Sequence, residues 1–467
     1  MRAGVLVLCA LLISNMLSGQ DMASRSVIDT IRIEGNKKTL DGVVLRELEF
    51  WQGDTLSHKA LKNAMRESRS NLKNTTLFNF VDVVKQEVRP GHVEIQVKVT
   101  EQWYTWVIPM FEMVDRNFNT WWQTRDFTRA DIGLLFIQKN FRGRRERINF
   151  KIIGGHNEYV NLQYEVPYFD KKKRFGLTFE GSMIRSHETA MKTQNDEVVF
   201  YTEENSYPIK KSAVDVSLLY RRMFKRKHLF TFSYQDYTFA DTLTTLNPDF
   251  LLEENSRSRF LTISYDYERD YRDYISYPLN GNYLNLTLRK AGLGLMNENV
   301  DFWSFRAYYS QYHQLSSRWY AAAGVMALLS GESDHPYYLK NGLGLGYAKE
   351  FVRSYEYNVI NGNNYGLFRS NIKYALVPTR TFKLDFLPLE QFNKVFYALY
   401  LNVFFDAGYV DPFQTWQSNG NQLPGTFLTG KGIGLDLVTY YEKVFRIEYS
   451  WNKNNEGGFF LHFVAPI

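Results

Sequence analysis

The stretch Tyr283–Arg289 reads YLNLTLR and alternates strictly between polar and apolar side chains. In an extended strand this period of two puts the three leucines on one face and the polar side chains on the other. The runs Val160–Val166 and Phe230–Gln235 repeat the pattern. The same periodicity continues from Trp103 to the C-terminus, so the sequence predicts a large antiparallel sheet with one apolar and one polar face.

A second apolar layer would be needed to cover such a sheet in water. No helical pattern follows residue 102 to supply one, and no apolar stretch beyond residue 20 reaches the length of a transmembrane helix. The apolar face can instead meet lipid while the polar face lines a lumen, which requires a closed sheet. We count about sixteen such segments, an even number as in single-chain bacterial barrels. Residues 103–467 are therefore predicted to form a transmembrane β-barrel.

Composition supports a barrel in the bacterial outer membrane. The chain holds 32 Tyr, 35 Phe and 9 Trp, the residues that form aromatic girdles at membrane interfaces. A large soluble β-sandwich protein shares this composition, so it does not decide the fold alone. The net charge of +6 is small for the length and the basic residues are dispersed, which argues against nucleic acid as a partner.

The N-terminus is typical of a secretory signal peptide over residues 1–19. Arg2 precedes an apolar run, Val5–Ile13, and small residues lead to a cleavage site near Gly19. A membrane anchor is the alternative, but the run is much shorter than the roughly 20 residues a spanning helix needs. Cys9 is the only cysteine, so the mature chain is expected to have no disulfides and no thiol chemistry.

Residues 20–102 are predicted to form a separate periplasmic α/β domain. Ser57 is the expected N-cap of its second helix, and Arg89-Pro90-Gly91 is a turn signal. The expected order is β-α-α-β-β, with a strand over Val27–Gly35, a helix over about Thr39–Leu48, a helix after Ser57, and strands over Phe78–Glu87 and His92–Glu101.

This unit resembles the polypeptide-transport-associated (POTRA) domain in two short motifs. They are IRIEGN at Ile31–Asn36 and LFNFVDV at Leu77–Val83. The resemblance implies a domain that receives unfolded protein chains. An exposed strand edge can add such a chain by main-chain hydrogen bonds, and we expect this docking edge at Phe78, Phe80, Val81 and Val83.

Three stretches of the barrel region resemble the BamA/TamA superfamily of outer-membrane assembly and secretion barrels, the bacterial surface antigen family. They are the loop motif Val352-Arg353-Ser354-Tyr355, the strand motif formed by Phe404, Asp406 and Gly408, and the closing run at 432–463. The segment Asp270–Gly281 adds weaker support. The chain departs from the family pattern at Ser354, where glycine is usual, and at Ile467, where an aromatic end is common.

The resemblance implies a loop–strand ion pair in the lumen. Alternation along the strand at 396–408 places Asp406 opposite the apolar Phe405, so its carboxylate is expected to point inward. The family motifs imply that Arg353, in a long loop, folds inward and meets it. A solvated arginine on a mobile loop is the alternative.

Strand order also predicts sidedness and a seam. If the small domain is periplasmic, short turns at 140–144, 168–172 and 223–227 lie on that side, and longer loops lie outside at 114–129, 185–210, 238–256, 330–363 and 408–430. Pro109 in the first strand, Gly457 and Gly458 in the last strand and Pro466 at its end weaken ladder pairing. Closure between these strands is therefore expected to be the weakest in the barrel.

The sequence shows no pattern of catalytic chemistry. The eight histidines are scattered without nucleophile or metal-ligand spacing, and Gly342, Gly344 and Gly346 precede no helix that would complete a phosphate loop. We expect no enzyme activity, no cofactor and no metal site.

The leading functional prediction is that client strands are captured by the small domain and passed to the barrel seam. The expected partners are unfolded outer-membrane or secreted proteins, the lipid bilayer and accessory assembly subunits. A partner-specific secretion pore and a passive porin-like or structural barrel remain alternatives. The sequence leaves open which client is handled.

Overall fold

The computed structural model describes residues 25–113, 130–170, 172–223, 225–251, 255–296, 300–331, 335–344, 350–383, 394–412, 419–439 and 443–462. The expected signal peptide and the expected loop at 114–129 lie outside these ranges. The chain divides into two compact units, with the boundary between Gln102 and Trp103.

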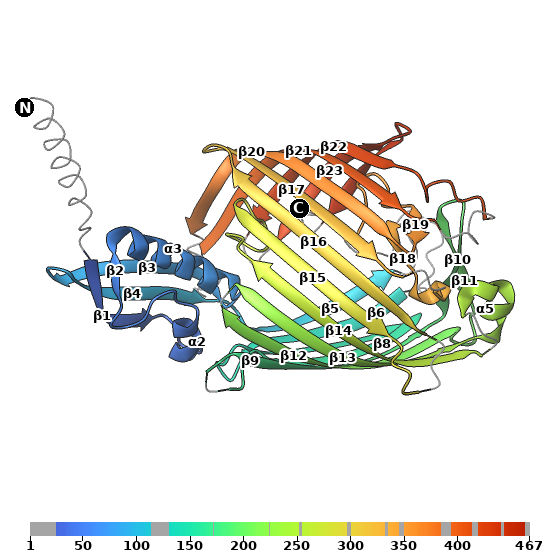
Figure 1. Cartoon of the computed structure of the whole chain (residues 1–467), viewed down its shortest axis with the longest axis horizontal. Helices are drawn as coiled ribbons and strands as arrows, with labels where there is room; N and C mark the ends of the chain where they lie inside the picture. Colours follow the sequence, from blue (N-terminus) through green and yellow to red (C-terminus); the bar gives the residue numbers. More distant parts are fainter. Residues whose placement is uncertain are drawn as a thin grey trace, which may run out of the picture. The chain divides into compact units, whose positions relative to one another are not determined.

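The first unit is a four-stranded sheet with two helices (Figure 1). The sheet order is β2-β1-β4-β3, with β1 and β4 parallel and the other pairs antiparallel. Ser57 caps α3 by accepting a hydrogen bond from the Ala60 amide, as predicted. The elements are β1 (Arg25–Glu34), α2 (Asp41–Arg46), β2 (Thr55–Ser57), α3 (His58–Asn74), β3 (Phe78–Arg89) and β4 (His92–Glu101).

The unit's core lies between α3 and the sheet. Leu61 and Leu72 of α3 are buried together with Ile28 of β1 and Ile95 of β4. The order is β-α-β-α-β-β, so the prediction omitted β2. A three-residue strand is too short to show a period in the sequence. β3 pairs only with β4 in the described sheet and is therefore an edge strand.

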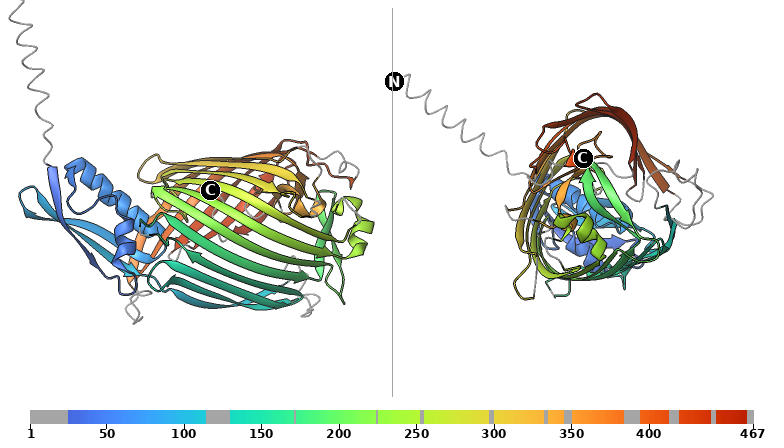
Figure 2. Two further views of the ribbon diagram at one scale, coloured as in Figure 1. Left: turned by 60° about the horizontal axis from the view of Figure 1, so that its bottom comes forward. Right: turned by 90° about the vertical axis from the view of Figure 1, so that its right-hand side faces the viewer.

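The second unit contains a single sheet of sixteen strands, which confirms the predicted barrel and its strand number (Figures 1 and 2). Each strand is antiparallel to its neighbours, and the end-on view in Figure 2 shows the sheet curling around a lumen. The strands are β5 (Thr105–Met113), β6 (Ala130–Phe141), β7 (Glu146–Gly155), β8 (Asn157–Val166), β9 (Phe175–Ser186), β12 (Ile209–Met223), β13 (Arg226–Phe239), β14 (Arg257–Asp270), β15 (Gly281–Ala291), β16 (Phe302–Gln314), β17 (Trp319–Leu329), β20 (Tyr365–Lys383), β21 (Lys394–Val410), β22 (Leu428–Thr439), β23 (Val444–Asn452) and β24 (Gly457–His462).

The two faces of the sheet differ as the alternation predicts. On β22, Ile433 and Leu435 are half-exposed to the outside of the barrel, whereas Asp436 is wholly buried on the inner face. Apolar side chains therefore line the outer face, where lipid can accommodate them. Within the described ranges, no helix combines the length and the hydropathy that a membrane-crossing helix needs.

Several loops carry short elements that gather at one end of the barrel (Figure 1). An apolar cluster joins them, with Met191, Leu243, Phe250 and Tyr337 packed together. A hydrogen bond from Asn361 to Thr193 ties the β10–β11 hairpin to β19. These elements are β10 (Glu188–Gln194), β11 (Glu197–Thr202), α5 (Asp241–Leu246), η2 (Pro248–Phe250), η3 (Tyr337–Leu339), β18 (Asn341–Gly344) and β19 (Val359–Gly362).

Candidate functional site in the barrel lumen

Residues 350–358, which precede β19, form a loop that folds inward and places Arg353 against β21. We call this segment the inward-folded loop. Arg353 and Asp406 both have fully buried side chains. Arg353 Nε donates to Asp406 Oδ2 at 2.7 Å, Nη2 donates to Oδ1, and the Arg353 amide donates to Oδ2 at 3.2 Å. The guanidinium lies 3.8 Å from the Phe404 ring centroid. This bidentate, stacked arrangement is the geometry for which arginine is suited and lysine is not.

Glycines on the strands allow the loop to come this close. A Cβ at Gly430 of β22 would lie 1.9 Å from the Arg353 carbonyl oxygen, and one at Gly408 of β21 would lie 2.6 Å from Val352 Cγ2. Ser354 at the loop tip has φ +83°, a left-handed conformation that glycine adopts without steric cost. The loop therefore keeps the conformation for which the family's glycine is suited, with serine in its place.

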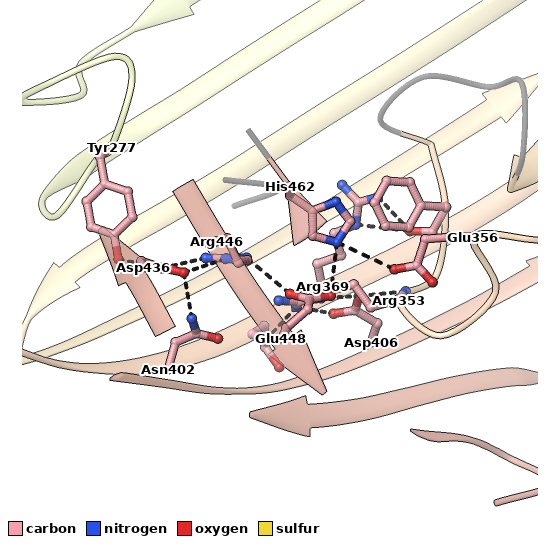
Figure 3. A network of polar contacts seen from close by, with 12 residues as sticks. Tyr277, Arg353, Glu356, Arg369, Asn402, Asp406, Asp436, Arg446, Glu448 and His462 are labelled. Carbon is pink, nitrogen blue, oxygen red and sulfur yellow. Dashed lines mark hydrogen bonds and ion pairs between the residues drawn. The ribbon is translucent and has the colours of Figure 1, made fainter. Parts of the chain in front are cut away.

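A second buried pair lies further along the same wall. Arg446 of β23 donates to both carboxylate oxygens of Asp436 on β22, at 2.6 and 2.7 Å. Tyr277 donates to Asp436 at 2.7 Å, and Asn402 donates at 2.9 Å. Figure 3 shows these groups converging on the one carboxylate. A buried anion with this many donors is compensated for the water it has lost.

A third group, which we call the carboxylate–histidine cluster, consists of Glu356, Glu448 and His462. Glu356 belongs to the inward-folded loop, Glu448 to β23 and His462 to β24. His462 Nε2 lies 3.3 Å from Glu448 Oε1 and 3.7 Å from Glu356 Oε1. The ligand atoms of all three side chains lie within 4.8 Å of one another. Through His462, the cluster includes the last described strand.

The remaining residues of the loop motif serve packing. Val352 and Tyr355 are buried in an apolar cluster with Leu343, Tyr365 and Leu428. Tyr355 Oη also accepts a hydrogen bond from the Lys453 amide. Val352 and Tyr355 therefore hold the loop by apolar packing before and after Arg353, the residue that forms the ion pair.

Residues of the expected docking edge separate into two environments. Phe78 and Val81 are buried in the core of the small unit, whereas Phe80 and Val83 are partly exposed. Arg69 of α3 donates to the Val81 carbonyl at 2.8 Å. From Val84 to Arg89, beyond these residues, the side chains of β3 are exposed.

The residues expected at the seam lie in the two end strands of the sheet. In the described ranges the sheet runs from β24 to β5, and no ladder joins these two strands. Pro109 lies opposite Leu134 of β6, and Gly457 and Gly458 lie opposite Trp451 and Ser450 of β23. Pro466 and Ile467 lie outside the described residues.

Sequence reasoning did not find Asp436, Arg446 or the carboxylate–histidine cluster. The first two carry a detectable signal, because each is a charged residue at an inward position of consecutive strands and they pair directly across the ladder. For Glu356 and His462 there is no such signal. They lie 106 positions apart and meet only because the loop folds into the lumen.

Comparison with known proteins agrees with this architecture. Residues 140–459 match the family model of the Omp85 superfamily domain, and residues 26–102 match the POTRA family model, described as surface antigen variable number repeat. A sequence search of the curated proteins finds no significant match.

Two solved structures share the fold at low sequence identity. BamA from Haemophilus ducreyi lacking POTRA domains 1–3 is 16% identical, with a TM-score of 0.51, over 93% of this chain and 83% of that one. CdiB from Escherichia coli is 11% identical, with a TM-score of 0.54, over 94% and 75%. Because the superfamily model spans most of the sixteen-stranded sheet and the POTRA model spans the first unit, this chain belongs to the Omp85 superfamily of outer-membrane β-barrels and carries a POTRA domain.

Proposed function

We propose that this protein assists the insertion or translocation of other proteins at the outer membrane. Client strands are captured by the POTRA domain in the periplasm and passed to the barrel seam. The observation that carries the proposal is that β3 of the POTRA domain and the end strands β5 and β24 of the barrel each have a single sheet neighbour in the described ranges. Unpaired edges offer main-chain donors and acceptors to an incoming strand.

The β3 edge supports capture through its second half. Val84 and Val88 are 44% and 61% exposed, while the first half of the strand is held by core packing and by Arg69. A client strand can add to the exposed half without displacing the core. Recognition through the main chain reads little sequence, which suits a protein that handles unfolded chains.

The β24 edge supports release into the membrane. Among the described residues, β24 pairs with β23 over six residues, whereas β22 pairs with its neighbours over most of twelve. Gly457 and Gly458 add no side chain that could hold the ladder by packing. An end strand that begins with two adjacent glycines is expected to separate more readily than the other strands.

A passive porin is less favoured because part of the lumen wall is covered. The inward-folded loop occupies the inner face of β20–β23, and the β10–β11 hairpin joins the loops at one end of the barrel. A dedicated secretion pore remains the second candidate, since CdiB shares the fold as well as BamA. Depletion followed by an outer-membrane proteome separates the two, because general assembly affects many proteins and dedicated secretion affects one. A large single-channel conductance with no change in the proteome would favour a porin.

Capture at β3 is tested with a proline substitution. Val83→Pro removes a main-chain donor at the residue that borders the exposed half of β3 and is expected to reduce photo-cross-linking of client chains to the POTRA domain. Val83→Ala keeps the amide and is the matched control. Full cross-linking in a Val83→Pro variant whose POTRA domain is folded, as judged by circular dichroism, contradicts capture at this edge.

Release at the seam is tested with cysteine pairs between β5 and β24. The expected mature chain has no other cysteine, so oxidation would join only the introduced pair. Locked protein is expected to lose activity and to recover it on reduction. Normal activity of the locked protein contradicts lateral opening while leaving capture at β3 intact.

A further inference from the structure

We propose that the carboxylate–histidine cluster binds a divalent transition-metal ion of the zinc class, and that the ion ties the inward-folded loop to strands β23 and β24. The three ligands come from three separate segments: Glu356, Glu448 and His462. One ion would therefore join the inward-folded loop to two neighbouring strands of the sheet.

The donor set and its spacing suit such an ion. Imidazole nitrogen with carboxylate oxygens is a common zinc environment, with metal–ligand bonds of about 2.0–2.2 Å. Tetrahedral bonds of that length separate neighbouring ligand atoms by about 3.4 Å. His462 Nε2 lies 3.3 Å from Glu448 Oε1 and 3.7 Å from Glu356 Oε1, so small side-chain movements would complete the coordination.

The nearby arginines do not fully balance the charges of the Glu356 and Glu448 carboxylates. Arg353 and Arg446 are engaged in bidentate contacts with Asp406 and Asp436. Arg446 Nη1 approaches Glu448 Oε2 only to 3.9 Å. Two carboxylates thus face one imidazole, each beyond direct hydrogen-bond range of the guanidinium groups.

Burial makes a cation at this point favourable. The Glu448 side chain is fully buried, yet its Oε2 has no hydrogen bond of normal geometry, and neither has either oxygen of Glu356. Buried carboxylate oxygens without donors are costly, and a cation held between the two carboxylates would lower that cost.

Packing fixes the orientation of the histidine. The Phe351 ring stacks on His462 at 5.8 Å between centroids and 17° between planes. Arg369 donates to the Phe351 carbonyl and lies over the same ring. Held in this way, the imidazole presents Nε2 to both carboxylates, as Figure 3 shows. A preset ligand direction is what supporting side chains provide at metal sites.

The test is zinc binding by the full mature chain, folded in detergent and stripped with EDTA. Isothermal titration is expected to give one tight site in the wild type and a rise in the thermal unfolding midpoint. Glu448→Gln and His462→Gln keep the shape of the side chains. Each is expected to weaken binding by at least about 100-fold, since even the outer partners of metal ligands contribute about 10–100-fold.

His228→Gln is the matched control, because His228 is a partly buried histidine that contacts Tyr265 on β14 and lies outside the cluster. Its zinc affinity is expected to equal that of the wild type. Folding of each variant is checked by heat-dependent migration on gels. If a β-strand variant does not fold, Glu356→Gln in the loop takes its place. Equal zinc binding by all variants, or none by the wild type, overturns the proposal, and neither result bears on client capture at β3.

Discussion

Two parts of the barrel wall differ in how far the side chains on their inner face are buried. On β22 and β23 every inward side chain is buried and the outward ones are exposed or partly exposed. On β15 nearly all side chains of both faces are partly exposed. We call β20–β23 the covered wall and β12–β15 the open wall. The same alternating pattern therefore gives two different interiors.

The inward-folded loop accounts for the difference. Among the described barrel residues, every charged side chain exposed by 1% or less lies in that loop or on the covered wall: Arg353, Lys373, Asp406, Asp436, Arg446 and Glu448. Charges on the open wall remain partly hydrated, as for Lys227 and Glu268 at 40% and 28%. Polar interactions on the two walls should accordingly contribute different amounts to the free energy of unfolding. Four predictions test this difference.

The largest effect is expected for Arg353→Ala, which leaves Asp406 buried without its main donor. Loss of one partner of a buried pair costs about 3–5 kcal/mol, and we expect that loss in the free energy of unfolding, measured by urea titration in detergent. Asp406→Ala should cost a similar amount. The double variant should be little worse than either single one, because the two side chains form one unit.

Lys227→Ala on the open wall is the control for that comparison. Its pair with Glu268 is partly hydrated, so the expected loss is below about 1 kcal/mol. Equal losses at Lys227 and Arg353, or additive losses in the Arg353/Asp406 double variant, would show that the covered wall is not dry.

Tyr277→Phe tests the second buried pair with a smaller change. It removes one of the hydrogen bonds to Asp436, and a hydrogen bond to a charged group contributes about 1.5–3 kcal/mol. On the inner face of the open wall, Ser217→Ala removes a hydrogen bond between β12 and Thr231 of β13 and is expected to cost about 0.5–1.5 kcal/mol. The same urea titration measures both, and a larger loss for Ser217→Ala would reverse the proposed order of the walls.

Gly430→Ala tests whether close approach of the loop creates the covered wall. The added Cβ would meet the Arg353 carbonyl at 1.9 Å, a backbone contact that cannot be relieved by a rotamer change. We expect a loss of about 1–3 kcal/mol, as for other overpacked sites, and greater protease cleavage of the loop. Gly181→Ala, on β9, is the control, because its Cβ would meet nothing within 4 Å. If both variants are cleaved alike, the loop does not depend on this approach.

The open and covered walls were not equally predictable from the sequence. Period-two alternation predicted sixteen strands and the inward direction of Asp406, because side-chain direction follows from strand geometry alone. It could not predict that one wall is covered, since that depends on the path of a loop. Asp436 and Arg446 required the register between β22 and β23, and His462 required the position of the loop as well. Short elements such as β2 and the β18–β19 pair carry too few residues for a period.

The smallest expected effect is a gain, from Ser354→Gly at the tip of the loop that covers the wall. Ser354 has φ +83°, and a non-glycine residue in the left-handed region pays about 1–2 kcal/mol. Glycine removes that strain but has greater freedom in the unfolded chain, which offsets about 0.5–1 kcal/mol. The net gain in the free energy of unfolding is therefore about 0.5–1 kcal/mol.

Ser354→Ala separates backbone strain from the loss of the hydroxyl, because alanine keeps the Cβ and gains nothing in the left-handed region. Ser354→Gly should also slow protease cleavage of the loop, whereas Ser354→Ala should not. A gain in both variants would assign the effect to the hydroxyl. Stabilisation by glycine alone means that the covered wall is maintained against strain at the loop tip, by the Arg353–Asp406 pair and the apolar cluster around Val352.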